Sequence, residues 1–137
     1  MSDSKRRKRP RSATSSSSLG IARVDLAPKK RAEALDELRF MPDDDFKTVA
    51  VVAEYMEVIT MNAGVKLFNE GSTSRHMAVI VDGSVQIQKT TFNDEIKILT
   101  TLDRGKVIGE MSVIDGEPRS AAAVAQIPTT LLILHQK

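Results

Sequence analysis

An acidic and a basic residue lie nine positions apart in the C-terminal part of the chain, in a segment suited to binding an anion. Glu110 and Arg119 fall within the stretch GEMSVIDGEPR, which interrupts the strand pattern on either side and contains Gly109, Gly116 and Pro118. Such a segment can form a short helical turn whose exposed backbone N–H groups bind phosphate. Arg119 would add a planar fork of donors for that phosphate, and Glu110 would accept a hydrogen bond from a sugar hydroxyl.

The same two residues allow a second interpretation, in which Glu110 and Arg119 pair with each other across the loop. The two charges would then be structural and would bind no ligand. Residue types and spacing favour neither interpretation, because an ion pair and a nucleotide site both place opposite charges in one loop.

Composition excludes several other kinds of site. The 137 residues include no cysteine, which excludes a disulfide framework, a thiolate zinc site and a cysteine nucleophile. The two histidines, His76 and His135, lie 59 positions apart, too far for a helical His-x3-His metal pair. No general base or activated nucleophile accompanies Glu110 and Arg119, so we expect a binding protein without a metal ion rather than an enzyme.

The sequence also predicts where the protein works. No apolar run approaches the roughly 18 residues that suggest a membrane span. The basic N-terminal stretch is followed by serines rather than by the apolar segment of a secretory signal. We therefore expect a cytoplasmic protein with no membrane span.

Charge is divided unevenly along the chain. Residues 1–31 carry ten Lys and Arg against two acidic residues, a net +8, and the rest carries ten basic and sixteen acidic residues, a net −6. The stretch KRRKRPRSATSSSS has too few apolar residues to offset the entropy of ordering, so we predict a disordered basic tail at residues 1–27. The tail could contact nucleic acid or anionic lipid, serve as a nuclear-localisation address, fold back on the acidic domain or have no partner.

Two short amphipathic helices are predicted after the tail. The first begins near Pro28, a residue suited to a first helical turn, and the second spans about 43–54 and begins with three acidic residues that complement the helix dipole. The apolar positions are Ala32, Leu35, Leu38 and Phe40 in the first helix and Phe46, Val49, Val52 and Ala53 in the second.

Beyond Tyr55 the chain alternates apolar and polar residues, is rich in β-branched residues and has glycine turns at short intervals. An Asp-Gly turn at Asp82-Gly83, followed by SVQIQKT, predicts a hairpin. About eight short strands with few inward charges predict a mainly β protein, a closed or sandwich-like antiparallel β-roll rather than an open sheet. Because aromatic residues make up only 4% of the chain, Val, Ile, Leu and Met must fill the core.

Three stretches resemble the cyclic nucleotide-binding domain family. GEMSVIDGEPRSAAAV resembles its phosphate-binding cassette, and the spacing from Glu to Arg is similar to that in regulatory subunits of cyclic-AMP-dependent protein kinase. GVKLFNEG resembles the family's Gly-x-x-Leu/Ile-x-x-Glu/Gln-Gly turn, and MAVIVDGSVQI resembles its strand-Gly-strand hairpin. The resemblance covers about residues 40–137. It implies a jelly-roll-like, double-stranded β-helix with short flanking N-terminal helices and a phosphate-binding cassette helix.

The resemblance also implies ligand contacts, position by position. Glu110 would accept the ribose 2′-hydroxyl and Arg119 would bind the cyclic phosphate. Six further residues would line the pocket or contact the ligand: Gly83, Gly109, Met111, Ser112, Ser120 and Ala121. The implied function is a regulatory domain over residues 28–137 that senses a cyclic nucleotide and controls a protein partner or a further effector domain.

The base of the ligand depends on Ser120. Its hydroxyl could reach a guanine amino group, as a threonine at this position does in cyclic-GMP-preferring relatives. Arg-Ser also occurs in cyclic-AMP-binding bacterial regulators, and we favour cyclic AMP over cyclic GMP.

This chain departs from the family pattern at two places. Gly71 is followed by Ser72 where family members often have Asp, which concerns one supporting hydrogen bond and none of the ligand contacts. The sequence ends at Lys137, just after the last predicted strand, so we expect a domain without the C-terminal lid helix. Two alternative functions are a DNA-associated transcription regulator fragment, supported only by the basic tail, and a kinase-regulatory subunit in which RPRSAT is a substrate or inhibitory segment.

Overall fold

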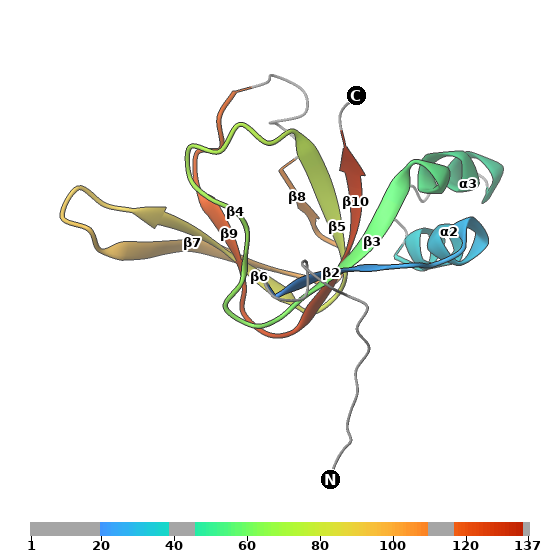
Figure 1. The fold of residues 1–137 in the computed structure, drawn as a ribbon, viewed down its shortest axis with the longest axis horizontal. Helices are drawn as coiled ribbons and strands as arrows, with labels where there is room; N and C mark the ends of the chain where they lie inside the picture. The colour runs from blue at the N-terminus through green and yellow to red at the C-terminus, as the bar shows by residue number, and fades with distance from the viewer. Residues whose placement is uncertain (1–19, 39–45, 110–116, 136–137) are drawn as a thin grey trace, which may run out of the picture.

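The computed structural model describes residues 20–38, 46–109 and 117–135. Within these ranges two antiparallel sheets face each other, and two helices lie at one side of them (Figure 1). The strands are β2 (Ile21–Val24), β3 (Met56–Met61), β4 (Lys66–Phe68), β5 (His76–Asp82), β6 (Ser84–Thr90), β7 (Ile96–Asp103), β8 (Val107–Ile108), β9 (Ala122–Ala125) and β10 (Thr129–His135). The predicted mainly β, antiparallel roll is confirmed. The predicted cassette helix falls largely on residues 110–116, which lie outside the described residues.

The core lies between the two sheets. One sheet has the strand order β2-β3-β10-β5-β8 and the other has the order β4-β9-β6-β7. Alternate residues of β3, β5, β9 and β10 point inward, as the period-two pattern predicts, whereas β7 is exposed along nearly its whole length. The buried residues of this core are Ile59, Met61, Phe68, Ala78, Ile80, Val85, Ile108, Ala123, Ala125, Leu131 and Ile133. As predicted, nearly all of them are aliphatic, and Phe68 supplies the aromatic ring in this set.

A second cluster lies on the outer face of the five-stranded sheet, beneath the helices α2 (Pro28–Glu37) and α3 (Phe46–Glu54). Its buried members are Leu35, Val49, Met56, Val58, Val79 and Leu132. Strand β10 is therefore covered on both faces, which explains why TTLLILH reads as a continuous apolar run rather than an alternating one.

The helices follow the predicted pattern with one exception. Helix α2 begins at Pro28 and buries Ala32 and Leu35. Helix α3 buries Val49 and Ala53, but Phe46 is 44% exposed, because packing covers only the middle and the C-terminal turn of that helix. Of the apolar positions predicted for the second helix, Phe46 is thus the one left exposed, and the predicted positions 40 and 43–45 lie outside the described residues.

Strand β2 corrects the predicted extent of the disordered tail. The sequence predicted disorder through residue 27, whereas Ile21–Val24 pairs with β3, from Ile21 opposite Met61 to Val24 opposite Val58. The edge of β3 supplies the backbone partners that the composition of this segment could not indicate. Residues 1–19, which contain most of the predicted tail, lie outside the described residues.

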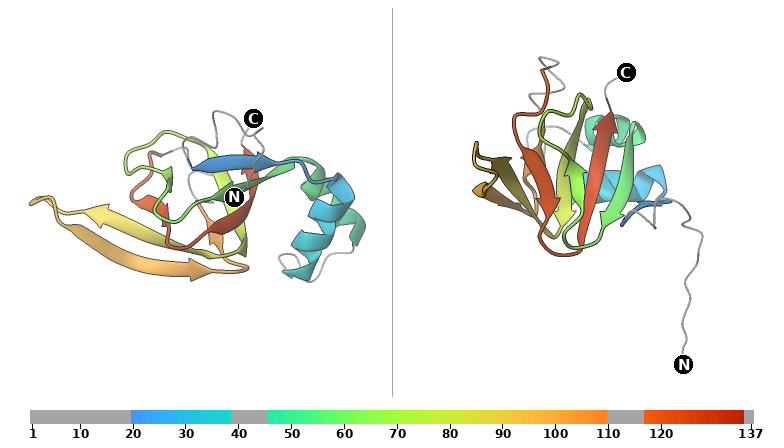
Figure 2. Two further views of the ribbon diagram at one scale, coloured as in Figure 1. Left: turned by 60° about the horizontal axis from the view of Figure 1, so that its bottom comes forward. Right: turned by 60° about the vertical axis from the view of Figure 1, so that its left-hand side comes forward.

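The Asp82-Gly83 turn joins two strands as predicted but does not form a hairpin. Strand β5 pairs with β10 and β8, whereas β6 pairs with β7 and β9, so the turn carries the chain from one sheet to the other. Gly83 has φ +113°, and a Cβ atom there would lie 2.7 Å from the Thr129 Cα. The tight corner therefore requires glycine. The long hairpin of the fold is β6–β7, which projects beyond the rest of the roll (Figure 2).

Candidate functional site

Arg119 lies just before β9, and two backbone hydrogen bonds fix its position. Its N–H donates to the Ser72 carbonyl at 2.8 Å, and its carbonyl accepts from the Gly71 N–H at 2.7 Å. The Gly-Ser turn at residues 71–72 thus anchors the arginine through backbone groups that do not depend on the side chain at residue 72.

The guanidinium of Arg119 is buried and held from several sides. Nη2 donates to the His76 carbonyl at 2.6 Å, Nη1 donates to the Gly109 carbonyl at 3.1 Å, and Nε lies 3.4 Å from the Ser74 hydroxyl. The guanidinium carbon stands 4.0 Å from the centroid of the Phe68 ring. The residue as a whole is only 5% exposed.

These contacts leave the charge of Arg119 without a carboxylate among residues 20–38, 46–109 and 117–135. Its described hydrogen-bond partners are two carbonyls and one hydroxyl, all neutral. Burial lowers the pKa of the guanidinium from its usual value. Arginine has five N–H donors, and the contacts to described residues use three, so no described residue binds the second donor of either terminal nitrogen. Two such donors suit the bidentate binding of a phosphate.

Gly109 makes room for this guanidinium. Its φ is +79°, and a Cβ atom there would lie 3.1 Å from the Arg119 Cζ and 3.1 Å from the His76 carbonyl oxygen. Both the left-handed backbone and the close approach require glycine. The structure therefore brings Gly109 and Arg119 together, as the resemblance implies.

Ser120 and Ala121 follow Arg119 and differ in exposure, since Ala121 is buried and Ser120 is exposed. The Ser120 carbonyl accepts a hydrogen bond from Lys89 Nζ at 2.8 Å. Lys89 also pairs with Glu70 at 3.3 Å, and the N–H of Thr90 together with Lys89 lowers the pKa of that carboxyl. A second cation thus lies at the C-terminal side of the cassette.

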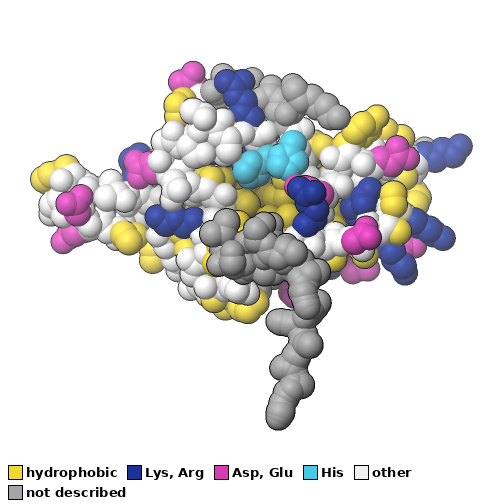
Figure 3. All heavy atoms as spheres, viewed as in Figure 1, with side chains coloured by type: hydrophobic (Ala, Val, Ile, Leu, Met, Phe, Trp, Pro, Cys, Tyr) yellow, Lys and Arg dark blue, Asp and Glu magenta, His cyan; other side chains and the backbone are white. Residues whose placement is uncertain are grey.

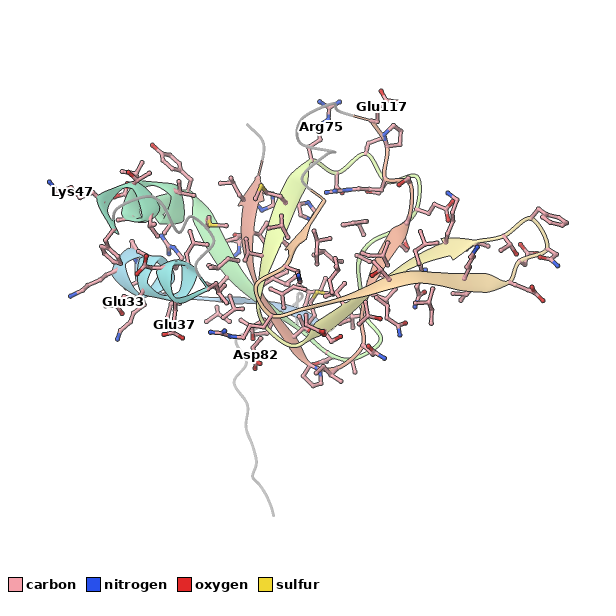
Figure 4. The ribbon with its side chains drawn as sticks, turned by 180° about the vertical axis from the view of Figure 1, so that it is seen from behind. Glu33, Glu37, Lys47, Arg75, Asp82 and Glu117 are labelled. Atoms are coloured by element: carbon pink, nitrogen blue, oxygen red, sulfur yellow. The ribbon has the colours of Figure 1, made fainter. Side chains whose placement is uncertain are left out.

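Gly83 lies far from Arg119. It follows the last residue of β5, whereas His76, which binds the guanidinium, is the first residue of that strand. Seven extended residues span roughly 20 Å. Figure 4 shows the separation, with Asp82 at one end of the roll and Arg75 and Glu117 at the other. Gly83 is a structural corner residue rather than part of the arrangement around Arg119.

Three predicted site residues, Glu110, Met111 and Ser112, lie outside the described residues. The structure therefore tests neither the assignment of the ribose contact to Glu110 nor the alternative pairing of Glu110 with Arg119.

A separate polar cluster lines a hollow of about 180 Å³ on the side of β2 and β3 (Figure 3). Arg23 Nε lies 3.0 Å from Glu57 Oε2, and the other carboxylate oxygen, Glu57 Oε1, lies 2.8 Å from His135 Nε2. The His76 ring lies 5.6 Å from the His135 ring. Its Nε2 atom is buried without a hydrogen-bond partner among the described residues. Burial, and then the charges of Arg119 and His135, lower the pKa of His76 to about 4.

Sequence reasoning did not identify the residues that support Arg119. Phe68, Ser74 and His76 come from β4, from the loop before β5 and from the start of β5. His76 contributes a backbone carbonyl, which carries no signal of residue type. Phe68 lies within the stretch GVKLFNEG, but an apolar residue in a strand is typical of the core. That its ring face contacts the Arg119 guanidinium is seen only in the folded structure.

Two kinds of site do not occur in the described part of the chain. It contains no group of three or more His, Cys, Asp or Glu residues that could hold a metal ion. Neither described helix is long and apolar enough to cross a membrane.

Comparison with known proteins decides the family. Residues 58–137, more than half of the chain, match the family model of the cyclic nucleotide-binding domain. The chain belongs to this family. It therefore contains a cyclic nucleotide-binding regulatory domain, and the predicted resemblance is confirmed.

Similar proteins agree with this membership. The chain is 32% identical over 74 residues to the Cyclic AMP receptor protein of Thermus thermophilus, a match that covers 54% of this chain and 34% of that protein. It is 28% identical to a cyclic nucleotide-binding domain from Methylobacillus flagellatus, with a TM-score of 0.73, over 85% of this chain and 67% of that one. The regulatory domain of Toxoplasma gondii PKA, solved with cAMP, shares the fold at 17% identity, with a TM-score of 0.73, over 80% of this chain and 42% of that one.

Proposed function

We propose that this domain binds cyclic AMP in preference to cyclic GMP, with the cyclic phosphate on Arg119 and the ribose 2′-hydroxyl on Glu110. The observation that carries the proposal is the buried guanidinium of Arg119, which contacts no carboxylate among the described residues and binds there through one donor on each terminal nitrogen. A cyclic phosphate is a monoanion with two free oxygens, which match the second donors of those two nitrogens. The pocket would also include Gly109, Met111, Ser112, Ser120 and Ala121.

The preference for cyclic AMP rests on the partial match to a protein named Cyclic AMP receptor protein. The Ser120 carbonyl already accepts a hydrogen bond from Lys89, and the residue is exposed. The hydroxyl of Ser120 is therefore its group for contact with the base or the phosphate. The ligand would stabilise the conformation of the domain that binds it more tightly. That shift in population would change how the domain binds a protein partner.

Calorimetric titration of the purified full chain with cyclic AMP and cyclic GMP in parallel tests the proposal. Arg119→Ala should weaken binding at least tenfold, since a charge-assisted phosphate contact contributes about 1.5–3 kcal/mol. Glu110→Ala should also weaken it. Arg104→Ala is the matched control, because Arg104 pairs with Glu37 on the surface and should not affect affinity.

Two results would contradict the assignment. Unchanged affinity in both Arg119→Ala and Glu110→Ala would exclude the proposed contacts, provided that circular dichroism shows the variants folded. Tighter binding of cyclic GMP than of cyclic AMP by the wild-type chain would reverse the proposed base preference and direct attention to Ser120→Ala.

A DNA-binding role is the second candidate function, and the charge division favours it. Residues 1–31 carry a net +8, against −6 for the rest of the chain, so any nucleic acid contact would involve the basic segment. Fluorescence anisotropy with duplex DNA should show binding that weakens steeply with salt and disappears when residues 1–19 are deleted. Binding that survives this deletion would exclude the basic segment as the contact, and no binding by the full chain would exclude the role.

A further inference from the structure

Phe68 occupies a particular place beneath Arg119. It is the last residue of β4 and is only 9% exposed, and its ring centroid lies 4.0 Å from the guanidinium carbon. The His76 and Phe68 rings form a T-shaped pair with 6.1 Å between centroids and 69° between the ring planes. The same His76 residue binds Arg119 Nη2 through its carbonyl. Phe68 thus contacts both the arginine and a residue of the strand that holds it.

The support that Phe68 gives differs from that of a carboxylate. The negative face of an aromatic ring attracts a cation most strongly where water is excluded, and both Phe68 and Arg119 are buried. A carboxylate would hold the guanidinium but would also neutralise it and use its paired donors. A neutral ring contacts the guanidinium carbon without adding a negative charge and without accepting its N–H donors.

We propose that Phe68 is a positioning residue for Arg119, and that its uncharged ring face fixes the guanidinium for phosphate. This inference rests on the proposed function of Arg119 as the phosphate ligand. Phe68 acts through Arg119, since its ring face meets the guanidinium, with 4.0 Å between the ring centroid and Cζ. It therefore affects how well the site is organised before the ligand arrives.

The test replaces Phe68 in the full chain with phenylalanines that carry one, two or three ring fluorines. Fluorination weakens the negative ring face with little change in size, so cyclic AMP affinity should fall stepwise with each fluorine. Phe68→Leu should weaken binding about five- to thirtyfold, because a cation–π contact shielded from water contributes more than an exposed one. The matched control is the same fluorine series at Phe92, which is fully exposed in the turn between β6 and β7 and should show no trend.

A second measurement needs no ligand. In the free wild-type protein the Arg119 Nε–H should exchange slowly with water because the side chain is buried and held, and Phe68→Leu should speed that exchange severalfold. Phe92→Leu should leave it unchanged. Hydrogen exchange of the core strands, followed in the same spectra, shows whether Phe68→Leu has disturbed the roll as a whole.

The outcomes separate the two proposals. If affinity does not follow the number of fluorines and Arg119 Nε–H exchange is unchanged in Phe68→Leu, the positioning role of Phe68 is wrong. If the wild-type chain binds no cyclic nucleotide but Arg119 Nε–H exchange responds to Phe68→Leu, the positioning role stands and the proposed function fails.

Discussion

Two arginines of this domain take part in different arrangements, and the difference indicates which one is suited to bind an anion. Arg23 on β2 has a side chain that is 76% exposed and pairs with Glu57, whose other oxygen binds His135. Arg119 is 5% exposed and contacts neutral acceptors and an aromatic ring. A surface ion pair satisfies its own charge and stabilises little. A buried cation that meets no carboxylate among the described residues is suited to bind an anion, and residues from β4, from the stretch 74–76 and from position 109 hold it in place.

The largest expected effect comes from closing the space beside Arg119. Gly109→Ala would place a Cβ atom 3.1 Å from Arg119 Cζ at a φ of +79°. We expect a loss of about 2–5 kcal/mol in the free energy of unfolding, from overpacking together with left-handed strain, and weaker cyclic nucleotide binding. Gly105→Ala is the matched control: its φ is +88° but no atom lies within 4 Å of the added Cβ, so only about 1–2 kcal/mol of strain applies. Denaturant unfolding measures both, and equal losses would contradict the close-approach argument.

Lysine substitutions compare the two arginines directly. Arg119→Lys keeps the charge but loses the planar fork and the stacking on Phe68, so we expect affinity for cyclic AMP to fall by about tenfold or more. Arg23→Lys should change affinity by less than about twofold, because a surface ion pair contributes little. Calorimetric titration measures both variants. A comparable loss in Arg23→Lys would show that the hollow beside β2 also contributes to binding.

The histidine between the two arginines should make stability depend on pH. Because the pKa of His76 is lowered to about 4 from 6.5, the unfolded chain takes up its proton first as the pH falls. Stability contributed by neutral His76 is therefore fully present above pH 6.5 and is lost as the pH falls toward about 4. Because the ring is partly exposed, we expect about 1–2 kcal/mol over this window rather than the larger value of a fully buried group.

Denaturant unfolding of wild type and His76→Gln across that pH range measures this contribution as a difference. The carboxyl groups titrate in both proteins, so their effect cancels. His135→Gln serves as the matched control, since His135 is exposed and paired with Glu57. Parallel pH curves for wild type and His76→Gln would show that His76 is protonated equally in the folded and unfolded states.

The smallest effect belongs to the surface pair. Arg23→Ala removes a pair with Glu57 that joins β2 to β3, and we expect a loss of no more than about 1 kcal/mol, which high salt should reduce further. Thermal unfolding at low and high salt measures it. A loss that is larger and insensitive to salt would mean that Arg23 contributes by packing rather than by charge.

Much of the fold was predictable because each local pattern agrees with its environment. The alternating strands, the first-turn Pro28 and the tight Gly83 corner all appear where the sequence placed them. The pairing of those strands was less predictable. The Asp82-Gly83 turn reads locally as a hairpin, and only the packing of two sheets makes it a corner between them. Strand β2 was missed for a similar reason, since its partner is a sheet edge formed by residues more than thirty positions later.

By itself the sequence determined the family and the choice of Arg119 as the phosphate ligand to test, because short motifs of fixed residue types encode both. It also determined the antiparallel β-roll, because alternating apolar residues and closely spaced turns encode short strands. Only the tertiary structure decided what surrounds that arginine. Phe68, Ser74, His76 and Gly109 meet it from separate segments, through a ring face, a hydroxyl and two backbone carbonyls. Carbonyls are the same in every residue, and ring orientation depends on packing. Neither leaves a trace in residue type, so the support of Arg119 emerges only when the strands are assembled.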